Sequence, residues 1–288
     1  MTQIGIGIVG GGYMGKAHSV AMQSVASIFD TPLRPRLEVI CASTKDSAAR
    51  YATAYGFQRA THDWKDLVAD PSVEAVVIAS PQHTHREIAT AAAAAGKPVF
   101  CEKPLGASIE DARAMVAAVE AAGVPNMTGF NYIRTPASQF ARRLISERAI
   151  GDITFIRIEH TEDFDADPAT PGSWRSQGRA NGTMGDLAPH PINAALALAG
   201  PITEVMADIQ TVHTTRPGAE GPIAVTNDDQ AQMMCRFDNG AMGHLFFSRV
   251  ATGRKMGYAY EISGTKGAIR FDQEDQNALW VYTMDDPP

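Results

Sequence analysis

Three glycines near the N-terminus, Gly10, Gly12 and Gly15, have the spacing of a phosphate-binding turn. They form the pattern GxGxxG directly after an apolar, strand-like run and at the opening of a helical stretch. In such a turn the first glycine permits the tight bend, the second lets the backbone approach a pyrophosphate, and the third lets the helix pack on the strand. The motif, with Tyr13 and Met14 inside it, predicts a dinucleotide site at the N-terminus of a helix. The alternative is a glycine-rich turn without a ligand.

The end of the second strand-like run bears on which dinucleotide fits. In this kind of site an acidic residue there holds the ribose hydroxyls and excludes a 2′-phosphate. Here the run ends in Cys41-Ala42-Ser43-Thr44-Lys45, so the acid is missing, whereas two hydroxyls and an ammonium group can receive a phosphate. We expect Ser43, Thr44 and Lys45 to bind the cofactor and to favour NADP over NAD. The alternative is that Lys45 only begins a solvated helix.

Short apolar runs alternate with helical stretches from residue 3 to about residue 128, which is the pattern of βαβ units that build a parallel sheet. The expected strands are residues 4–10, 37–42, 74–80, 98–102 and 124–130, and the expected helices are residues 14–26, 46–55, 83–95 and 109–122. Gly96 and Gly123 directly follow the last two helices, as C-terminal stop signals do. The pattern predicts a doubly wound, parallel α/β domain of the Rossmann type over residues 1–130.

The pattern changes after an expected helix at residues 136–148. Strand-like segments then follow one another, at residues 153–160, 203–212, 231–237, 241–248, 258–263 and 268–271. Asp238-Asn239-Gly240 is a strong hairpin signal, and the successive order favours antiparallel pairing. We expect an α+β domain with an open, predominantly antiparallel sheet over residues 131–288. The long stretch at residues 164–188 shows little periodicity, and such loops are often functional.

Composition argues against several classes of protein. The 288 residues contain 25 Lys and Arg against 32 Asp and Glu, and the net charge of −7 argues against a nucleic-acid partner. The longest apolar runs, at residues 88–95 and 194–199, are far shorter than the roughly 20 residues of a membrane span. No basic stretch precedes the apolar N-terminus, and the three cysteines are odd in number and far apart. We expect a cytoplasmic protein with reduced thiols.

Four segments resemble the Gfo/Idh/MocA family of glucose-fructose oxidoreductases and inositol dehydrogenases. They are AGKPVFCEKPL at residues 95–105, SPQHTH at 80–85, GFNYIRTP at 129–136 and GTMGDLAPH at 182–190. The tripeptide Glu102-Lys103-Pro104 is specific in this position. Together with the glycine motif, the segments span residues 4 to about 200, and Trp174-Arg175 further resembles a branch that acts on sugars and polyols.

The resemblance implies a Rossmann domain followed by an open sheet whose face often makes the subunit interface, with the substrate between that sheet and the nicotinamide. It identifies Lys103 with the lysine that hydrogen-bonds the substrate oxygen, Asp186 with the aspartate beside it, and His190 with the general base. It also implies an enzyme, an NAD(P)-dependent oxidoreductase acting on CH–OH groups. Such an enzyme needs no metal and forms a homodimer or homotetramer.

The chemistry of these three residues agrees with the implied roles. A base must remove the hydroxyl proton as hydride leaves the carbon, and histidine is the side chain best matched near neutral pH. Pro189 and Pro191 are tolerated only near the start of a helix, so His190 is expected there. The helix dipole disfavours the imidazolium form of His190 and Asp186 favours it, which leaves the protonation balance open. Lys103 follows the fifth strand, where open α/β sheets place ligand-binding residues.

Further residues are expected at the cofactor or at the substrate. The remaining cofactor residues are Ser80, Pro81, His83, His85, Glu102 and Lys103. The substrate residues are Lys103, Asn131, Tyr132, Arg134, Trp174, Arg175, Asp186 and His190. Several of these residues also have a structural alternative. His83 and His85 can begin a helix without touching a ligand, and Arg134 can pair with a surface acid. Trp174 can hold the long loop in place by packing.

Two features depart from the pattern of the resembled family. Relatives often carry an aspartate three residues after the motif histidine, where this chain has Asn193, and they commonly continue with a further strand and a closing helix where this chain stops at Pro288. The second departure leaves two expectations, either a truncated sequence or a minimal second domain.

Three hypotheses about function follow. The first is hydride transfer between a nicotinamide cofactor and a secondary alcohol or hemiacetal carbon of a sugar, inositol or related polyol. The second is an NAD-dependent glycosidase that oxidises a ring hydroxyl transiently and regenerates NAD within one turnover. The third is a non-catalytic nicotinamide-binding protein, which the joint presence of Lys103, Asp186 and His190 disfavours.

Overall fold

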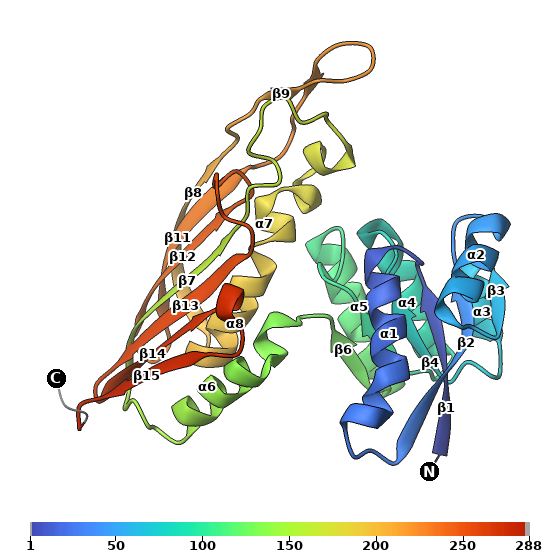
Figure 1. The fold of residues 1–288 in the computed structure, drawn as a ribbon, viewed down its shortest axis with the longest axis horizontal. Coiled ribbons are helices and arrows are strands. Elements are labelled where there is room, and N and C mark those ends of the chain that lie inside the picture. Colours follow the sequence, from blue (N-terminus) through green and yellow to red (C-terminus); the bar gives the residue numbers. More distant parts are fainter. Residues whose placement is uncertain (1, 286–288) are drawn as a thin grey trace. The chain divides into compact units, whose positions relative to one another are not determined.

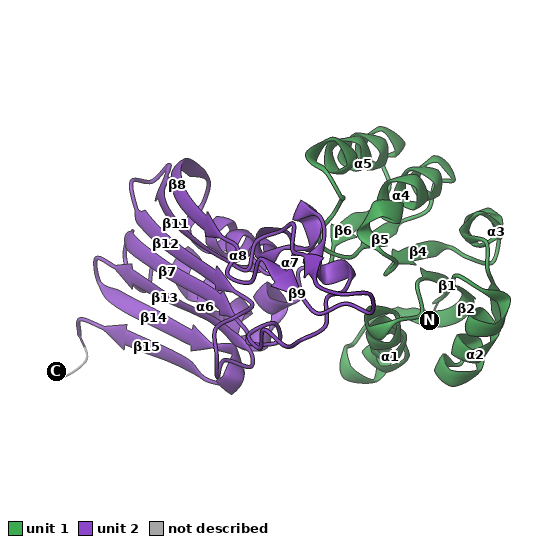
Figure 2. Ribbon diagram, turned by 90° about the horizontal axis from the view of Figure 1, so that it is seen from above, with its two compact units in different colours: residues 1–129 green, residues 130–288 purple. Residues whose placement is uncertain are grey.

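A computed structural model describes residues 2–285 of the chain. The chain divides into two compact units, residues 1–129 and residues 130–288, which Figure 2 colours separately. Each unit has a hydrophobic core of its own. No helix among residues 2–285 combines the length and the apolar character that a membrane crossing requires.

The first unit is a six-stranded parallel sheet with helices on both faces. The strands, in the spatial order β3-β2-β1-β4-β5-β6, are β1 (Thr2–Val9), β2 (Leu33–Cys41), β3 (Arg59–Thr61), β4 (Ala75–Ile78), β5 (Val99–Cys101) and β6 (Asn126–Thr128). The helices are α1 (Tyr13–Ile28), α2 (Lys45–Tyr55), α3 (Trp64–Ala69), α4 (His85–Ala94) and α5 (Ile109–Ala122). In Figure 2, α1 and α2 cover one face and α3, α4 and α5 the other. The strand order reverses between β1 and β4, the place where open parallel sheets bind ligands.

Alternation along the strands divides the first core into two layers. Because successive side chains of a strand point to opposite faces, Ile8 packs in one cluster with Ile40 and Phe57, whereas Val9 packs in another with Ile78. Both faces of the central strands are therefore buried, which explains their near-continuous apolar sequence. The expected stop signals are also present, since Gly96 and Gly123 have φ angles of +69° and +63°, which favour glycine.

The second unit is a seven-stranded mixed sheet with helices on one face (Figure 1). In the spatial order β15-β14-β13-β7-β12-β11-β8, its strands are β15 (Leu279–Thr283), β14 (Gly267–Asp272), β13 (Gly257–Gly264), β7 (Ile153–Thr161), β12 (Met242–Ser248), β11 (Gln230–Phe237) and β8 (Ile202–Gln210). A two-stranded ribbon adds β9 (Thr215–Arg216) and β10 (Ile223–Ala224), and the helices are α6 (Pro136–Ser146), α7 (Thr183–Asp186) and α8 (Pro189–Ala199). Five of the six pairings in the large sheet are antiparallel, and only β7 with β12 is parallel.

The core of the second unit lies between the large sheet and helices α6 and α8. Ala194 and Leu198 of α8 and Ala141 of α6 pack against the buried faces of the strands, for example against Ile158 and Leu245. The small side chains of Ala141 and Ala194 let the two helices lie close to the sheet. The opposite face of the sheet carries exposed apolar side chains on several strands.

The predicted fold class is confirmed in both halves. The parallel pair β7–β12 departs from a simple meander because the chain leaves β7 through α7 and α8, crosses to the sheet edge at β8, and returns through β11 to β12. The patterns also miss β3, β15, the β9–β10 ribbon and α3. β3 covers only the residues Arg59–Thr61, which contain no apolar run to mark them.

Candidate active site

The glycine turn between β1 and α1 has the shape of a phosphate cradle. Gly10 has a φ angle of +104°, and a Cβ atom there would lie 2.4 Å from the carbonyl oxygen of Ala79. A Cβ atom on Gly15 would lie 1.9 Å from the carbonyl oxygen of Gly10, so α1 packs directly on the turn. At Gly12, in contrast, no heavy atom comes within 4 Å of such a Cβ. The space above the second glycine is therefore open, whereas the first and third positions are closed.

The N-terminus of α1 fits a negatively charged group. No side chain caps this 16-residue helix at Gly12, and its first turn contains no acidic residue. The amide groups of the first turn and the positive end of the helix dipole thus face the open space. Tyr13 is exposed and Met14 is half-buried at the edge of the turn. A dinucleotide pyrophosphate fits this arrangement.

The residues after β2 lie at the surface of the first unit. Ser43, Thr44 and Lys45 are all exposed. The Thr44 hydroxyl is the N-cap of α2, because it accepts a hydrogen bond from the backbone N–H of Ser47 at 3.1 Å. Ser43 and Lys45 therefore remain as the side chains that could approach a ribose or its phosphate. None of the three is acidic.

The ends of β4 and β5 are tied together by a buried histidine. Nε2 of His85 lies 2.9 Å from the carbonyl oxygen of Ser80, and its Nδ1 lies 3.2 Å from the carbonyl oxygens of both Pro104 and Leu105. Both ring nitrogens thus contact the backbone of this chain, which matches the structural alternative for His85. His83, by comparison, is exposed on the short 3₁₀ turn at Gln82–Thr84, which Pro81 precedes.

Glu102 holds the backbone of Lys103 from inside the first unit. One carboxylate oxygen lies 2.7 Å from Nε2 of His18 on α1, and the other accepts the backbone N–H of Lys103 at 3.2 Å. A Cβ atom on Gly129 would lie 2.9 Å from this carboxylate, so only glycine leaves room for it. Lys103 itself is half-buried. The sequence motifs do not single out His18, which no spacing rule connects with Glu102.

In the second unit, His190 is the second residue of α8 and is buried among aromatic rings. Its ring centroid lies 4.5 Å from that of Tyr132, 5.6 Å from that of His160 and 5.9 Å from that of Phe130. Pro189 precedes it at the first position of the helix, as the two prolines predict. The rings restrict the orientation of the imidazole and exclude water from one side of it.

His160, near the end of β7, belongs to the ring cluster around His190, and the sequence patterns do not identify it. Its Nδ1 donates to the carbonyl oxygen of Leu187 at 3.2 Å, and its Nε2 lies 3.1 Å from a carboxylate oxygen of Glu162. The same Leu187 carbonyl accepts the backbone N–H of His190 at 3.2 Å. His160 thus holds the first turn of α8 and contacts the His190 ring. A buried polar position in an otherwise apolar strand face is the signal that could have marked it.

Tyr258 on β13 completes this cluster. Its ring stacks on Tyr132 with a centroid distance of 4.7 Å and lies 5.7 Å from the ring of His160. The hydroxyl is fully buried and has no hydrogen-bond partner among the described residues. Burial raises the pKa of Tyr258 far above its ordinary value, so the hydroxyl stays neutral.

Asp186 and Arg175 form an ion pair that the sequence does not predict. Nη1 of Arg175 lies 3.0 Å from Oδ2 of Asp186, and the guanidinium also lies over the rings of Trp174 and Phe164, at 4.7 and 5.6 Å. Trp174 and Arg175 belong to a short 3₁₀ turn in the long loop and are exposed. The loop thus presents a cation and an aromatic face beside the carboxylate of Asp186.

The remaining predicted residues lie on the segment before α6. Asn131 and Arg134 are exposed, whereas Tyr132 is half-buried and donates its hydroxyl to Sδ of Met256 at 3.4 Å. The structure therefore brings Tyr132 into the aromatic cluster around His190. Asn131 and Arg134 lie in the same short turn at the surface.

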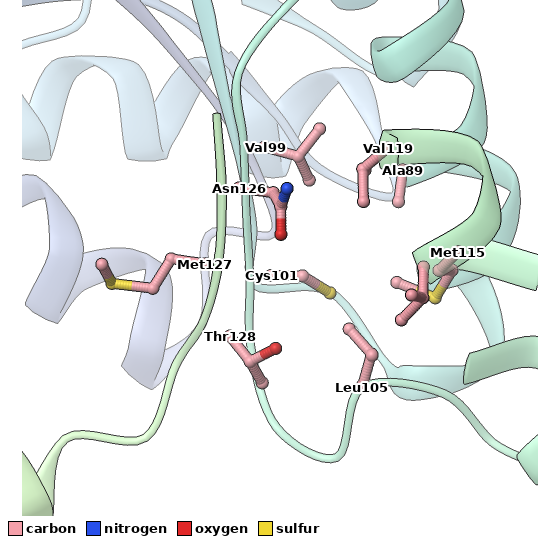
Figure 3. A pocket seen from close by; sticks show the side chains of 10 residues that line it. Ala89, Val99, Cys101, Leu105, Met115, Val119, Asn126, Met127 and Thr128 are labelled. Atoms are coloured by element: carbon pink, nitrogen blue, oxygen red, sulfur yellow. The ribbon is translucent and has the colours of Figure 1, made fainter. Parts of the chain in front are cut away.

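A small cavity in the first unit is separate from the predicted residues (Figure 3). It has a volume of about 60 Å³ and lies between helices α4 and α5 and strands β5 and β6. Its walls are mainly apolar, and none of the predicted site residues lines it. The one thiol in the wall belongs to Cys101, whose pKa burial raises to about 12. The cavity is a gap in the core without a reactive group.

Comparisons with known proteins decide the family. Residues 4–130 match the model of an oxidoreductase family with an NAD-binding Rossmann fold, and residues 138–270 match the GFO/IDH/MocA C-terminal domain. The chain belongs to the Gfo/Idh/MocA family. The predicted family and the predicted class of enzyme, a nicotinamide-dependent oxidoreductase, are therefore confirmed.

Two relatives illustrate the likeness. Levoglucosan dehydrogenase of Pseudarthrobacter phenanthrenivorans is 40% identical over 99% of this chain and 78% of its own length. Myo-inositol 2-dehydrogenase of Thermotoga maritima is 29% identical over 93% of this chain and 75% of its own length. A solved structure of levoglucosan dehydrogenase, in complex with NADH and L-sorbose, superimposes with a TM-score of 0.96 over 99% of this chain and 78% of that chain.

Proposed function

We propose that this chain oxidises a secondary hydroxyl group of a sugar or polyol and transfers the hydride to NAD or NADP. The main support for the proposal is the buried imidazole of His190 at the start of α8. The first unit of the same chain contains the open glycine turn that suits a dinucleotide. The relatives are named for levoglucosan, myo-inositol and D-apiose, which are all polyhydroxylated. Levoglucosan is the first substrate to test, because its dehydrogenase is the 40% identical relative.

The first unit would hold the cofactor. The open turn at Gly10, Gly12 and Gly15 suits the pyrophosphate, and Tyr13 and Met14 lie at its edge. The segments after β4 and β5 carry the other proposed contacts, which are Ser80, Pro81, His83 and Lys103. When bound, the nicotinamide supplies the acceptor for the hydride.

Two side chains are proposed to handle the proton and the charge of the substrate oxygen. His190 would accept the hydroxyl proton, and the surrounding rings would hold its imidazole in one orientation. The Lys103 ammonium group would stabilise the negative charge that develops on the oxygen, and the Glu102 carboxylate supports this role by fixing the Lys103 backbone. Arg175 and Asp186, held together as an ion pair, would bind neighbouring hydroxyl groups.

The choice between NAD and NADP rests on the residues after β2. The absence of an acid among Ser43, Thr44 and Lys45 supports NADP, whereas solved complexes of the 40% identical relative contain NADH. Titration of the purified protein with NADPH and NADH, followed by nicotinamide fluorescence, separates the two. Ser43→Asp should weaken NADPH binding more than NADH binding, and an unchanged ratio contradicts the role given to this segment.

The main experiment compares catalytic variants with matched surface variants. Lys103→Met and His190→Asn should each lower turnover of levoglucosan or another accepted polyol by roughly 10²–10⁴-fold, the usual contribution of such groups. Dinucleotide binding should persist in both variants. Lys65→Met and His62→Asn, which change exposed residues of the same types, serve as controls. Near-normal turnover in both catalytic variants contradicts the mechanism.

A glycosidase that regenerates NAD within each turnover is the second candidate. The names of the relatives favour net oxidation, since the levoglucosan, inositol and apiose enzymes are all called dehydrogenases. The same assay separates the two candidates, because a dehydrogenase accumulates reduced nicotinamide in proportion to oxidised substrate. Sugar cleavage without such accumulation favours the glycosidase.

We also propose that two copies of the chain associate through the outer face of the large sheet. Met206, Met234 and Met242 are exposed there, around a shallow groove of about 550 Å³. Glu204 and Arg236 face each other on neighbouring strands beside them, so this face carries both signs of charge and can complement a second copy of itself. Met234→Glu should dissociate the oligomer in light scattering, whereas Val20→Glu on exposed α1 should not. A monomeric parent protein contradicts this part.

A cytoplasmic location is proposed with the same function. The three cysteines are free and buried, which agrees with a reducing compartment. Fractionation of the source cells tests the location, and recovery outside the cytoplasmic fraction contradicts it.

A further inference from the structure

Arg249 is a buried guanidinium in the second unit, directly after β12. It donates to the carboxylate of Asp229 from Nε at 3.0 Å and from Nη2 at 2.8 Å, and Nη2 also donates to the side-chain oxygen of Asn227 at 2.8 Å. Asp165 contributes a second carboxylate 3.4 Å from Nε. All four residues are buried. The cluster is therefore a buried polar centre in which one cation lies against two carboxylates.

This centre also binds the backbone of the long loop. Nη1 of Arg249 donates to the carbonyl oxygens of Arg175 and Asn181, at 3.0 and 3.2 Å. Nδ2 of Asn227 donates to the carbonyl oxygens of Arg175 and Gly178, at 2.8 and 3.1 Å. Four side-chain hydrogen bonds thus hold residues 175–181, and the Arg175 carbonyl accepts two of them.

The residues next to Asn227 hold the start of α7 in the same way. The carbonyl oxygen of Asp229 accepts the Thr183 hydroxyl at 2.8 Å, and Oδ2 of Asp228 accepts the backbone N–H of Met184 at 2.7 Å. One short segment therefore fixes both the loop that carries Arg175 and the helix that carries Asp186.

We propose that Asn227 and Arg249 are positioning residues that set the geometry of the Arg175–Asp186 ion pair and thereby the affinity for the polyol. The inference rests on the proposed function, in which this pair contacts the substrate. The Arg175 side chain is exposed and lies in a loop with only short 3₁₀ turns, so its position depends on how its backbone is anchored. Groups that bind a substrate work best when they are held in place beforehand.

The mildest test is Asn227→Ala, because removing Arg249 would leave two buried carboxylates without their cation. The variant should raise KM for the polyol roughly tenfold, with kcat changed much less, the pattern expected when binding interactions are lost. The affinity for the dinucleotide should stay at the parent value, because the cluster lies wholly in the second unit. An unchanged KM in folded Asn227→Ala overturns the inference.

Asn239→Ala is the matched control. Asn239 lies in the turn between β11 and β12, where Nδ2 donates to the Ala199 carbonyl at 2.9 Å and Oδ1 accepts the backbone N–H of Ala241 at 3.0 Å. The control thus removes hydrogen bonds of the same kind outside the loop. Asn239→Ala should leave KM for the polyol at the parent value. If KM rises as much as in Asn227→Ala, the inference is overturned, because a general loss of stability would then explain both increases.

A double-mutant cycle tests whether Asn227 acts through Arg175. Arg175→Ala keeps the backbone carbonyl and removes the side chain beyond Cβ, the guanidinium included, so the effect of Asn227→Ala on KM should disappear in that background. The double variant should therefore have the KM of Arg175→Ala alone. Additive effects overturn the inference, since Asn227 would then act on the substrate by another route.

Hydrogen exchange supplies a measurement that does not depend on activity. The peptide covering residues 174–186 should exchange faster in Asn227→Ala than in the parent protein, and at the parent rate in Asn239→Ala. If the parent protein oxidises no polyol, the proposed function fails. If residues 174–186 exchange at the parent rate in Asn227→Ala, the inference is overturned whatever the activity. If the alanine variant does not fold, the nearly isosteric Asn227→Asp repeats the test.

Discussion

Asp229 offers a direct measure of how much the buried polar centre stabilises the second unit. Its carboxylate accepts four hydrogen bonds: Oδ1 from Nε and Nη2 of Arg249, and Oδ2 from the backbone N–H groups of Val212 and His213 at 2.7 and 2.8 Å. Asp229→Asn replaces one of these oxygens by an NH₂ group. Whichever way the amide is oriented, two donors then face two donors, and the guanidinium loses the charge of its main partner.

The magnitude follows from the bonds that are lost. Two hydrogen bonds to a charged group contribute about 1.5–3 kcal/mol each, which gives roughly 3–6 kcal/mol, and breaking a buried ion pair typically costs about 3–5 kcal/mol. Asp165 remains 3.4 Å from Arg249 and keeps part of the compensation. We therefore expect a loss of about 3 kcal/mol in the free energy of unfolding, which is large against the roughly 5–15 kcal/mol of a whole domain.

Urea unfolding in a Trp64→Phe background measures this loss of stability for the second unit separately from the first. Trp64 is in the first unit, whereas Trp174 and Trp280 are in the second, so the remaining fluorescence reports the second unit alone. With a urea dependence of about 1–3 kcal/mol per M, the midpoint should fall by at least about 1 M. Asp228→Asn is the matched control, because Oδ2 of Asp228 accepts only the Met184 N–H, and an amide oxygen can take its place.

The control should lose less than about 1 kcal/mol, the ordinary value of one hydrogen bond to the backbone. If Asp229→Asn and Asp228→Asn unfold at the same urea concentration, the buried ion pair adds nothing that an amide cannot supply. The view that the Asp229–Arg249 ion pair stabilises the second unit is then refuted, together with the magnitude derived from its contacts.

Three further predictions concern buried tyrosines and cysteines. Tyr258→Phe should raise the free energy of unfolding by about 1 kcal/mol, because a buried hydroxyl without a partner costs about 1–3 kcal/mol, whereas Tyr260→Phe should lower it by about 1 kcal/mol through loss of the bond to Ser138. Burial raises the pKa of the Cys41 thiol to about 11 and that of Cys101 to about 12, so neither should react with iodoacetamide at pH 8 until the protein unfolds. The folded protein keeps both thiol protons to a higher pH than the unfolded chain, whose thiol pKa is about 8.5. The stability contribution of the thiols is therefore complete below about pH 8.5 and is lost as the pH rises toward 11–12. The urea midpoint should accordingly fall over this alkaline range.

The first unit was predictable because its signals are local. The glycine turn, the apolar strands and the stop signals at Gly96 and Gly123 each depend on residues close in sequence, and the parallel order follows from their alternation with helices. The position of His190 at the start of a helix followed from its two flanking prolines. β3, which the patterns missed, has only three residues and carries no periodicity to read.

The cluster around His190 was not predictable in the same way. His160 reaches the Leu187 carbonyl from the middle strand of the large sheet, and Tyr258 reaches the cluster from the neighbouring strand. Both contacts require β7 to lie between β12 and β13, which follows from a crossover through α7 and α8 rather than from any single segment. A histidine on a strand carries no sign of this neighbourhood in its own sequence.

The Asp229–Arg249 pair is an intermediate case, because the sequence contains a signal for it. The turn at Asp238-Asn239-Gly240 sets the register of β11 and β12, so that residues equally distant from Asn239 face each other, as Met233 faces Leu245. Asp229 and Arg249 are the next such positions beyond the last ladder pair, and an acid opposite a base there predicts an ion pair. The register does not reveal that the loop at residues 175–181 covers the pair. Because of this loop the ion pair is buried rather than exposed, and Arg249 can hold the backbone of Arg175 by a hydrogen bond.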